Sequence, residues 1–125
     1  MPDELGRPVR AAIERRYALG AERRLSDKAD FERLLREGKR QSRSGYTFFI
    51  SMRTAGPARL GILVTRRHAA RATVRNRIKR CIREAFRMQQ AGLGAMDVLV
   101  RPPLGVRPGV RMLERLRGLF VELVK

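Results

Sequence analysis

Residues 59–87 decide the fold of this chain, and they read RLGILVTRRHAARATVRNRIKRCIREAFR. The stretch opens inside a run of β-branched and aliphatic residues, which predicts a strand over residues 58–65. Apolar residues then recur at intervals of three and four, which predicts a helix over residues 71–91 that ends near Gly92 or Gly94. The members of this apolar stripe are Val74, Ile78, Cys81, Ile82, Ala85 and Met88.

The segments around this centre predict a small α+β domain. The expected order is helix, strand, strand, helix, strand, helix, over residues 26–38, 45–52, 58–65, 71–91, 97–101 and 110–124. Gly56 and Pro57 predict a turn between the first two strands, so we expect these strands to pair as antiparallel neighbours. Within residues 45–52, even-numbered and odd-numbered side chains should face opposite sides of the sheet.

The charge balance limits the possible partners. The chain has 29 Lys and Arg against 12 Asp and Glu in 125 residues, and the resulting charge of +17 favours a polyanionic partner. Nucleic acid is the first candidate and an anionic membrane surface is the second. The length favours one domain. We expect a basic, flexible arm over residues 1–22 and an RNA-binding α+β domain over residues 23–125.

The sequence also bears on the cellular compartment. It contains no run of 18 apolar residues, so we expect no transmembrane helix and no membrane partner. Residues 1–24 lack the continuous apolar core of a secretory signal. Cys81 is the sole cysteine and has no partner for an internal disulfide, which fits a reducing compartment. We therefore expect a cytoplasmic protein.

A basic face runs along the helix predicted over residues 71–91. At 3.6 residues per turn, cations form a ladder with i, i+4 spacing at Arg71, Arg75, Lys79, Arg83 and Arg87. Like charges at this spacing repel each other, and a merely solvated face would mix both signs. Glu84 is the sole acid from residue 66 to residue 87. The ladder therefore predicts polyanion binding, and Asn76, Arg80, Arg66 and Arg67 extend the surface.

The pattern favours RNA or single-stranded DNA over duplex DNA. No leucine heptads follow the basic helix, as a basic zipper requires, and strands stand where a helix-turn-helix protein has its first helix. A sheet face with Thr47, Phe49 and Thr65, with Phe31 beside it, could stack on unpaired bases. Ordinary core packing explains Phe31 and Phe49 equally well, so the sequence leaves both interpretations open.

The chain shows no catalytic machinery of its own. His68 is the sole histidine and has no second histidine or cysteine at a metal-ligand spacing, so we interpret it as incidental. Cys81 falls on the apolar stripe and should be a buried thiol. We expect no catalytic residue and no metal ligand in the protein.

Residues 59–87 resemble the signature of the bacterial ribonuclease P protein component. That family has an Arg-Asn-Arg helix followed by Lys-Arg and Arg-Glu, which stand here as Arg75-Asn76-Arg77, Lys79-Arg80 and Arg83-Glu84. RLSDKADFERLLREGKR over residues 24–40 and GAMDVLVR over residues 94–101 fit the same family. The resemblance covers about residues 23–124.

The resemblance implies both a fold and an activity. The fold is a mixed sheet with three helices and a left-handed βαβ crossover, like domain 2 of ribosomal protein S5, although right-handed crossovers are the strong rule. The activity is endonucleolytic removal of the 5′ leader from precursor tRNA. In this family the catalyst is an RNA subunit with Mg²⁺ bound by that RNA and the substrate. The implied partners are ribonuclease P RNA and precursor tRNA, with no protein partner required.

The resemblance also implies residue roles. The residues expected to approach the catalytic RNA, with Arg71 added from the ladder, are Arg66, Arg67, Arg71, Arg75, Asn76, Arg77, Lys79, Arg80 and Arg83. The residues expected in the leader-binding cleft are Phe31, Leu35, Thr47, Phe49 and Thr65. The chain departs from the family at Leu35, where some members have phenylalanine, and at Pro102-Pro103, where several are more basic.

Two other functions compete with this interpretation. A structural RNA-binding protein, such as a ribosomal protein, would have the same composition, and only the ordered Arg-Asn-Arg helix after a strand favours the ribonuclease P subunit. A DNA-binding regulator is less favoured because the chain shows no dimerisation element.

Overall fold

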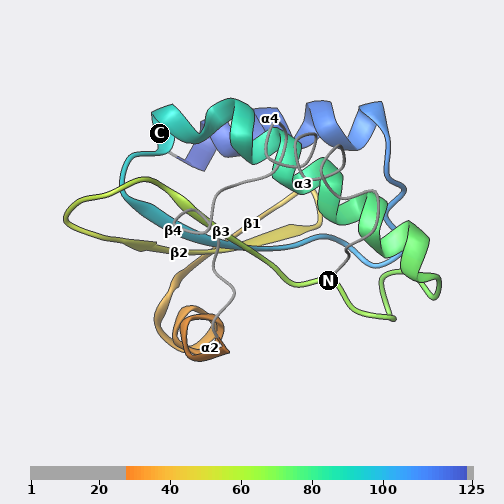
Figure 1. Cartoon of the computed structure of the whole chain (residues 1–125), viewed down its shortest axis with the longest axis horizontal. Helices are drawn as coiled ribbons and strands as arrows, with labels where there is room; N and C mark the ends of the chain where they lie inside the picture. Colours follow the sequence, from red (N-terminus) through yellow and green to blue (C-terminus); the bar gives the residue numbers. More distant parts are fainter. Residues whose placement is uncertain (1–27, 124–125) are drawn as a thin grey trace, which may run out of the picture.

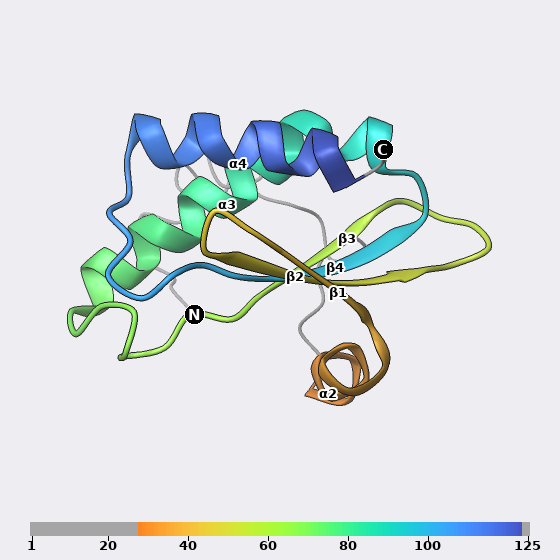
Figure 2. The same cartoon turned by 180° about the vertical axis from the view of Figure 1, so that it is seen from behind.

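The computed structural model describes residues 28–123, so the arm expected over residues 1–22 lies outside the described residues. The elements in chain order are α2 (Lys28–Glu37), β1 (Lys39–Arg43), β2 (Tyr46–Met52), β3 (Arg59–Ile62), α3 (Ala72–Leu93), β4 (Met96–Arg101) and α4 (Val110–Leu123). The four strands form one mixed sheet. Figure 1 shows α2 on one face of this sheet and α3 and α4 on the other, and Figure 2 shows the same layers from behind.

The alternation of side chains along β2 separates the two faces of the sheet, as predicted. Tyr46, Phe48 and Ile50 join the larger core beneath α3 and α4. Phe49 faces α2 instead, where it packs with Leu34. Burial of apolar side chains on both faces is the main force that holds the two helical layers against the sheet.

The larger core is organised around aromatic rings. Phe120 of α4 contacts both Phe48 of β2 and Phe86 of α3 in edge-to-face geometry, with ring centroids 5.7 Å apart in each pair. Phe86 is fully buried, whereas Met88, which we placed in the apolar stripe, is 44% exposed. The stripe therefore turns towards Phe86 in the later part of α3, where the helix packs on α4.

The prediction that the first two expected strands, over residues 45–52 and 58–65, pair directly was wrong; they are β2 and β3. The sheet order is β1-β2-β4-β3, so β4 lies between β2 and β3, antiparallel to the former and parallel to the latter. The physical reason is the apolar character of β4: Val98, Leu99 and Val100 are all fully buried, so this strand is covered on both faces. The loop around Gly56 spans the width of β4 instead of forming a tight hairpin.

Strand β1 was missed because its sequence, KRQSR, carries no apolar alternation. It is an edge strand that pairs with β2 through a turn at Ser44 and Gly45, which both have positive φ (54° and 83°). Two positive φ values are typical of the tight turn that matches the twist of a hairpin. Exposed cations suit an edge strand because they oppose pairing with another chain.

Helix α3 joins the parallel strands β3 and β4, and it carries the basic face. It ends at Gly94, which adopts a positive φ of 67°, consistent with the end predicted near Gly92 or Gly94. Among the helices that the structure describes, none is both long enough and apolar enough to cross a membrane.

A buried carboxylate ties α2 to the sheet. Asp97 of β4 is fully buried, and Arg59 donates to both of its oxygens at 2.8 Å. Arg33 of α2 donates to Asp97 Oδ2 at 3.2 Å, and Arg53 Nε lies 2.9 Å from Oδ1. Burial acts to raise the pKa of Asp97, but hydrogen bonds and charges from Arg59, with Arg53 and Arg33, outweigh it and hold the pKa below its usual value.

Candidate nucleic-acid interface

The basic face predicted on α3 is present, and most of its side chains reach solvent. Arg77 and Arg80 are exposed together with Asn76, whereas Arg75, Lys79 and Arg83 are half-buried. Arg71 is exposed at the N-cap, where its extended backbone (φ −87°, ψ 133°) precedes the first helical turn. No side chain caps this helix end. The positive end of the helix dipole is thus surrounded by cations, which favours an anionic partner there.

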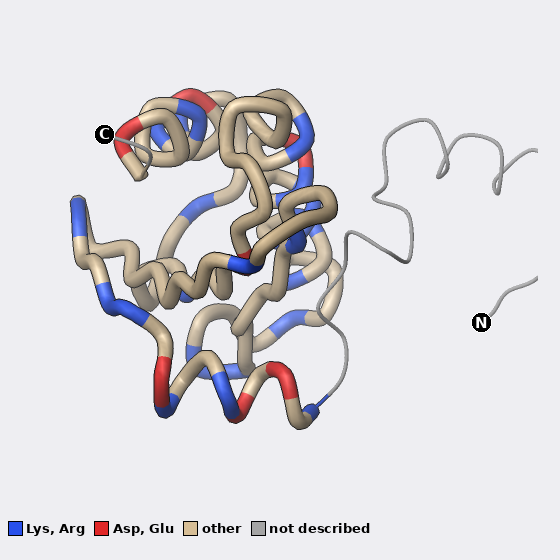
Figure 3. The backbone as a smooth tube through the Cα atoms, turned by 90° about the vertical axis from the view of Figure 1, so that its left-hand side faces the viewer, with Lys and Arg blue, Asp and Glu red and all other residues tan. Residues whose placement is uncertain are grey.

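The acidic side chains are concentrated on other elements. Figure 3 shows Lys and Arg positions along α3 and the loop before it, whereas α2 and α4 carry most of the acidic positions. On α3 the acid Glu84 is paired with Arg87. That pair lies beyond the first half of the helix, so the first half presents cations without intervening acids.

Arg75 has a structural role that the sequence did not reveal. Its guanidinium donates to the backbone carbonyls of Ala69 and Ala70 at 3.0 Å and 2.9 Å. These bonds fold the segment before α3 back onto the first turn of the helix. A guanidinium has five N–H donors, so Arg75 can close this loop and still bind a phosphate.

The other predicted basic residues, Arg66 and Arg67, occupy the centre of a tight turn. The carbonyl of Thr65 accepts from the N–H of His68 at 2.9 Å, and Thr65 Oγ1 accepts from the N–H of Arg67 at 3.2 Å. Both arginines are exposed. The turn therefore presents two exposed arginines between the end of β3 and the start of α3.

His68 holds this turn, so its interpretation as an incidental loop residue was wrong. Its side chain is only 7% exposed, and both ring nitrogens have partners. Thr65 N–H donates to Nδ1 at 3.0 Å, and the carbonyl of Pro102 lies 3.0 Å from Nε2. A backbone N–H can only donate and a carbonyl can only accept, so Nδ1 accepts from Thr65 and Nε2 donates to Pro102; the Thr65 hydroxyl lies 3.2 Å from Nδ1 as well.

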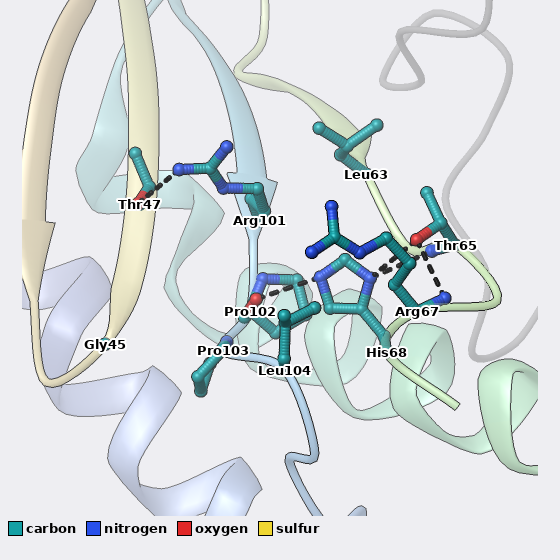
Figure 4. Close-up of a pocket in the computed structure, with 10 residues that line it drawn as sticks. All are labelled: Gly45, Thr47, Leu63, Thr65, Arg67, His68, Arg101, Pro102, Pro103 and Leu104. Carbon is teal, nitrogen blue, oxygen red and sulfur yellow. Dashed lines mark hydrogen bonds between the residues drawn. The ribbon is translucent and has the colours of Figure 1, made fainter. Parts of the chain in front are cut away.

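A pocket of about 420 Å³ opens beside this turn (Figure 4). Thr47 and Arg101 place it on the same face of the sheet as Phe49, which α2 partly covers. Its lining comes from three regions of the chain: Gly45, Thr47, Leu63, Thr65, Arg67, His68, Arg101, Pro102, Pro103 and Leu104. Arg101 donates to Thr47 Oγ1 at 3.4 Å. The pocket combines two guanidinium groups and two hydroxyls with apolar walls, a set that suits a phosphate and the base attached to it.

The structure brings some of the predicted cleft residues together and separates others. Thr47 and Thr65 line the pocket, but Phe31, Leu35 and Phe49 do not. Phe49 is 7% exposed and packs with Leu34, Leu99 and the half-buried Phe31, so it lies within the smaller core instead of forming an open stacking surface. The Arg101 guanidinium lies 6.0 Å from the Phe49 ring and links this core to the pocket.

Arg101 is the pocket residue that sequence reasoning missed but had the means to find. It follows Asp97 and Leu99 at period-two spacing along β4, which places it on the same face as Phe49. His68 and Pro102 carry no comparable signal, because their contact joins residues 34 positions apart.

Within residues 28–123, no group of three or more histidine, cysteine or acidic residues is placed to hold a metal ion. Cys81 is half-buried, and its thiol lies 3.8 Å from the carbonyl of Gly109. The candidate site is therefore one of charge, hydrogen-bond donors and shape.

The chain is similar to known proteins in sequence and in fold. Residues 19–120 match the family model described as Ribonuclease P. The chain is 36% identical over 104 residues to the ribonuclease P protein component of Nitrosococcus oceani, which covers 82% of this chain and 87% of that protein. It is 41% identical over 93 residues to the Bordetella parapertussis protein of the same name, which covers 69% and 74%. A Staphylococcus aureus RNase P protein mutant has the same fold, with a TM-score of 0.70 at 22% identity over 97% of both chains.

Proposed function

Because the chain belongs to the ribonuclease P protein component family, we propose that it binds the catalytic RNA of ribonuclease P and the 5′ leader of precursor tRNA. In this role it promotes hydrolysis of the phosphodiester bond that joins the leader to the mature tRNA. The observation that carries the proposal is the position of a cationic turn and helix directly beside a pocket with two arginines.

The basic surface is assigned to the catalytic RNA. We define it as Arg66, Arg67, Arg71, Arg75, Asn76, Arg77, Lys79, Arg80 and Arg83. Arginine forks bind phosphate oxygens in two-point geometry, and release of the RNA counterions drives the association. Two polyanions repel each other, so a cationic protein between them lowers the cost of bringing catalytic RNA and precursor together.

The pocket and its surroundings are assigned to the leader. Thr47, Thr65, Arg67 and Arg101 supply hydroxyl and guanidinium donors for the backbone of a single strand. The Phe49 ring lies beneath the Arg101 guanidinium, 6.0 Å away, and Phe49 is only 7% exposed. We therefore assign Phe49 to positioning Arg101 and not to direct stacking on bases. Phe31 and Leu35 lie on α2 outside the pocket lining, and we assign them to contact with a longer leader. Contact with the leader favours precursor over mature tRNA.

Catalysis is assigned to the RNA subunit. Hydrolysis of this kind draws on Mg²⁺, which polarises the phosphate and activates water. Among the residues that the structure describes, no three acidic, histidine or cysteine side chains are grouped to hold such an ion, and the buried carboxylate Asp97 is already bound by Arg59 and Arg33. We therefore place Mg²⁺ on the RNA subunit and the precursor. The assembly works in the cytoplasm without a membrane or a further protein.

Cleavage of precursor tRNA at low Mg²⁺ tests the proposal, with the RNA subunit alone, the protein alone, and both together. We expect efficient cleavage only when both are present. Cleavage by the protein alone would place the active site in the protein. Tight RNA binding without any effect on cleavage would favour a structural RNA-binding protein instead.

A further inference from the structure

His68 is the buried polar side chain that the proposed function leaves unused. It closes the turn that carries Arg66 and Arg67, it lines the pocket, and only 7% of it is exposed. Its ring nitrogens join backbone groups from different parts of the fold: Thr65 at the end of β3 and Pro102 at the end of β4. The ring thus connects two segments that the sheet hydrogen bonds do not hold together beyond Leu63.

The contact between these two segments bears on the pocket, because each segment carries one of the pocket's arginines. Arg67 comes from the turn at Thr65–His68, and Arg101 directly precedes Pro102. No acidic side chain lines this pocket. Two guanidinium groups that share a pocket without a carboxylate do not attract each other, so the charges of these side chains do not hold the turn against the end of β4.

The imidazole of His68 supplies an attraction between the two segments through its hydrogen bonds. Its Nδ1 lone pair accepts from Thr65 N–H and so stabilises the turn, while its Nε2–H donates to the Pro102 carbonyl and so ties that turn to β4. A lysine or arginine in this position would add a third cation, and an aliphatic residue would leave both backbone groups without this partner.

We propose that His68 is a positioning residue that fixes the distance between Arg67 and Arg101. With this distance fixed, the turn can bind the catalytic RNA while the pocket binds the leader. This inference rests on the proposed function and adds a specific device to it. According to this inference, the preference for precursor tRNA depends on the hydrogen bonds through which the His68 ring joins two backbone segments, as well as on the cations.

Substitutions at residue 68 can remove the hydrogen bond to Thr65 and the hydrogen bond to Pro102 one at a time. Asparagine places its amide oxygen near the position of Nδ1, so His68→Asn keeps an acceptor for Thr65 N–H but does not reach Pro102. Glutamine places its amide nitrogen near the position of Nε2, so His68→Gln keeps the donor to Pro102 but loses the acceptor for Thr65. His68→Ala removes both.

Each variant is assembled with the RNA subunit, and its affinity is measured for precursor tRNA and for the same tRNA without a leader. The affinity of each variant for the RNA subunit and its thermal midpoint are measured in parallel. We expect the precursor preference to fall about three- to tenfold in His68→Asn, as for the loss of one hydrogen bond, and at least as much in His68→Ala, which loses both. In His68→Gln the preference should stay within about threefold of the wild type. Affinity for the RNA subunit should change little in all three.

Two results would overturn the inference. The first is a precursor preference that is unchanged in His68→Ala. The second is an equal fall of the precursor preference in His68→Gln and His68→Asn, accompanied by a fall in affinity for the RNA subunit and in thermal midpoint. The second result would show that His68 only maintains the fold. The wild-type protein distinguishes a failure of this inference from a failure of the proposed function. If the wild-type protein confers no precursor preference, the proposed function itself is wrong, whatever the variants show.

Discussion

Arg80 and Arg75 share the basic surface of α3 but differ in what they contact. Arg80 is exposed, whereas Arg75 is half-buried and donates to the carbonyls of Ala69 and Ala70. The helical period of the sequence places Arg75 in the ladder of cations and Arg80 at the flank of that ladder. It says nothing of the loop carbonyls that Arg75 reaches, because these become neighbours only when the chain turns back before α3. The same limit applies to His68, whose partner Pro102 is remote in sequence.

Replacement of Arg80 by alanine should weaken binding to the RNA subunit without a cost in stability. Loss of one phosphate contact lowers the slope of log affinity against log salt by about one unit. The measurement is a salt titration of binding, with the thermal midpoint as a check on folding. Arg117→Ala, at an exposed position of α4 outside the basic surface, is the matched control for the loss of one charge. An equal effect of both substitutions would show that only net charge matters.

Replacement of Arg75 by alanine should reduce the salt slope by a similar amount and also destabilise the protein. The loss of the bonds to Ala69 and Ala70 should lower the free energy of unfolding by about 1 kcal/mol. Urea denaturation of Arg75→Ala beside Arg80→Ala measures this difference. If the two variants unfold at the same urea concentration, the contacts of Arg75 with the loop contribute nothing to stability.

At the scale of elements, the position of β4 explains most of what the sequence predicted and what it missed. Alternation along β2 correctly predicts the two faces of the sheet, and the helical period correctly predicts α3. The strand order could not be predicted from neighbouring segments, because β4 enters the sheet between β2 and β3 after the whole of α3. Strand β1 is stabilised by its hairpin with β2, which an apolar pattern cannot reveal.

Asp97 connects β4 to three arginines on other elements, so Asp97→Asn should be strongly destabilising. The substitution leaves Arg33, Arg53 and Arg59 close together without their shared carboxylate. Removal of one partner from a buried ion pair costs about 3 kcal/mol or more. Urea denaturation measures this cost, and the double variant Asp97→Asn with Arg59→Leu is the control, because it removes one of the stranded charges. A loss below about 0.5 kcal/mol, the range of ordinary surface substitutions, would contradict this role.

The lowered pKa of Asp97 also predicts how stability depends on pH. The folded-state pKa lies below the unfolded value of about 3.9, so the stabilisation is complete above that value and is lost as pH falls through the folded-state pKa. The wild-type free energy of unfolding should therefore fall below about pH 4 more steeply than that of Asp97→Asn. Denaturation curves at a series of pH values provide the comparison, and parallel pH profiles would show that Asp97 does not contribute.

At the scale of the whole molecule, the charge of +17 and the fold act together. Composition alone predicts a polyanionic partner, and the order of motifs predicts the family. The fold places the basic surface and the pocket next to each other. The turn at Arg66 and Arg67 lies between the basic helix and the pocket, so this one segment belongs to both surfaces. The composition of the pocket could not be predicted in full, because its lining comes from the β1–β2 turn, the end of β3 and the segment after β4.

The central claim is that this protein makes the ribonuclease P assembly prefer precursor tRNA through contact with the leader. The most direct measurement compares the affinity of the RNA subunit for precursor and for leaderless tRNA, with and without the protein, at one salt concentration. The account predicts a clear preference for the precursor only when the protein is present, and its reduction in Arg101→Ala. Equal preference with and without the protein would contradict the account.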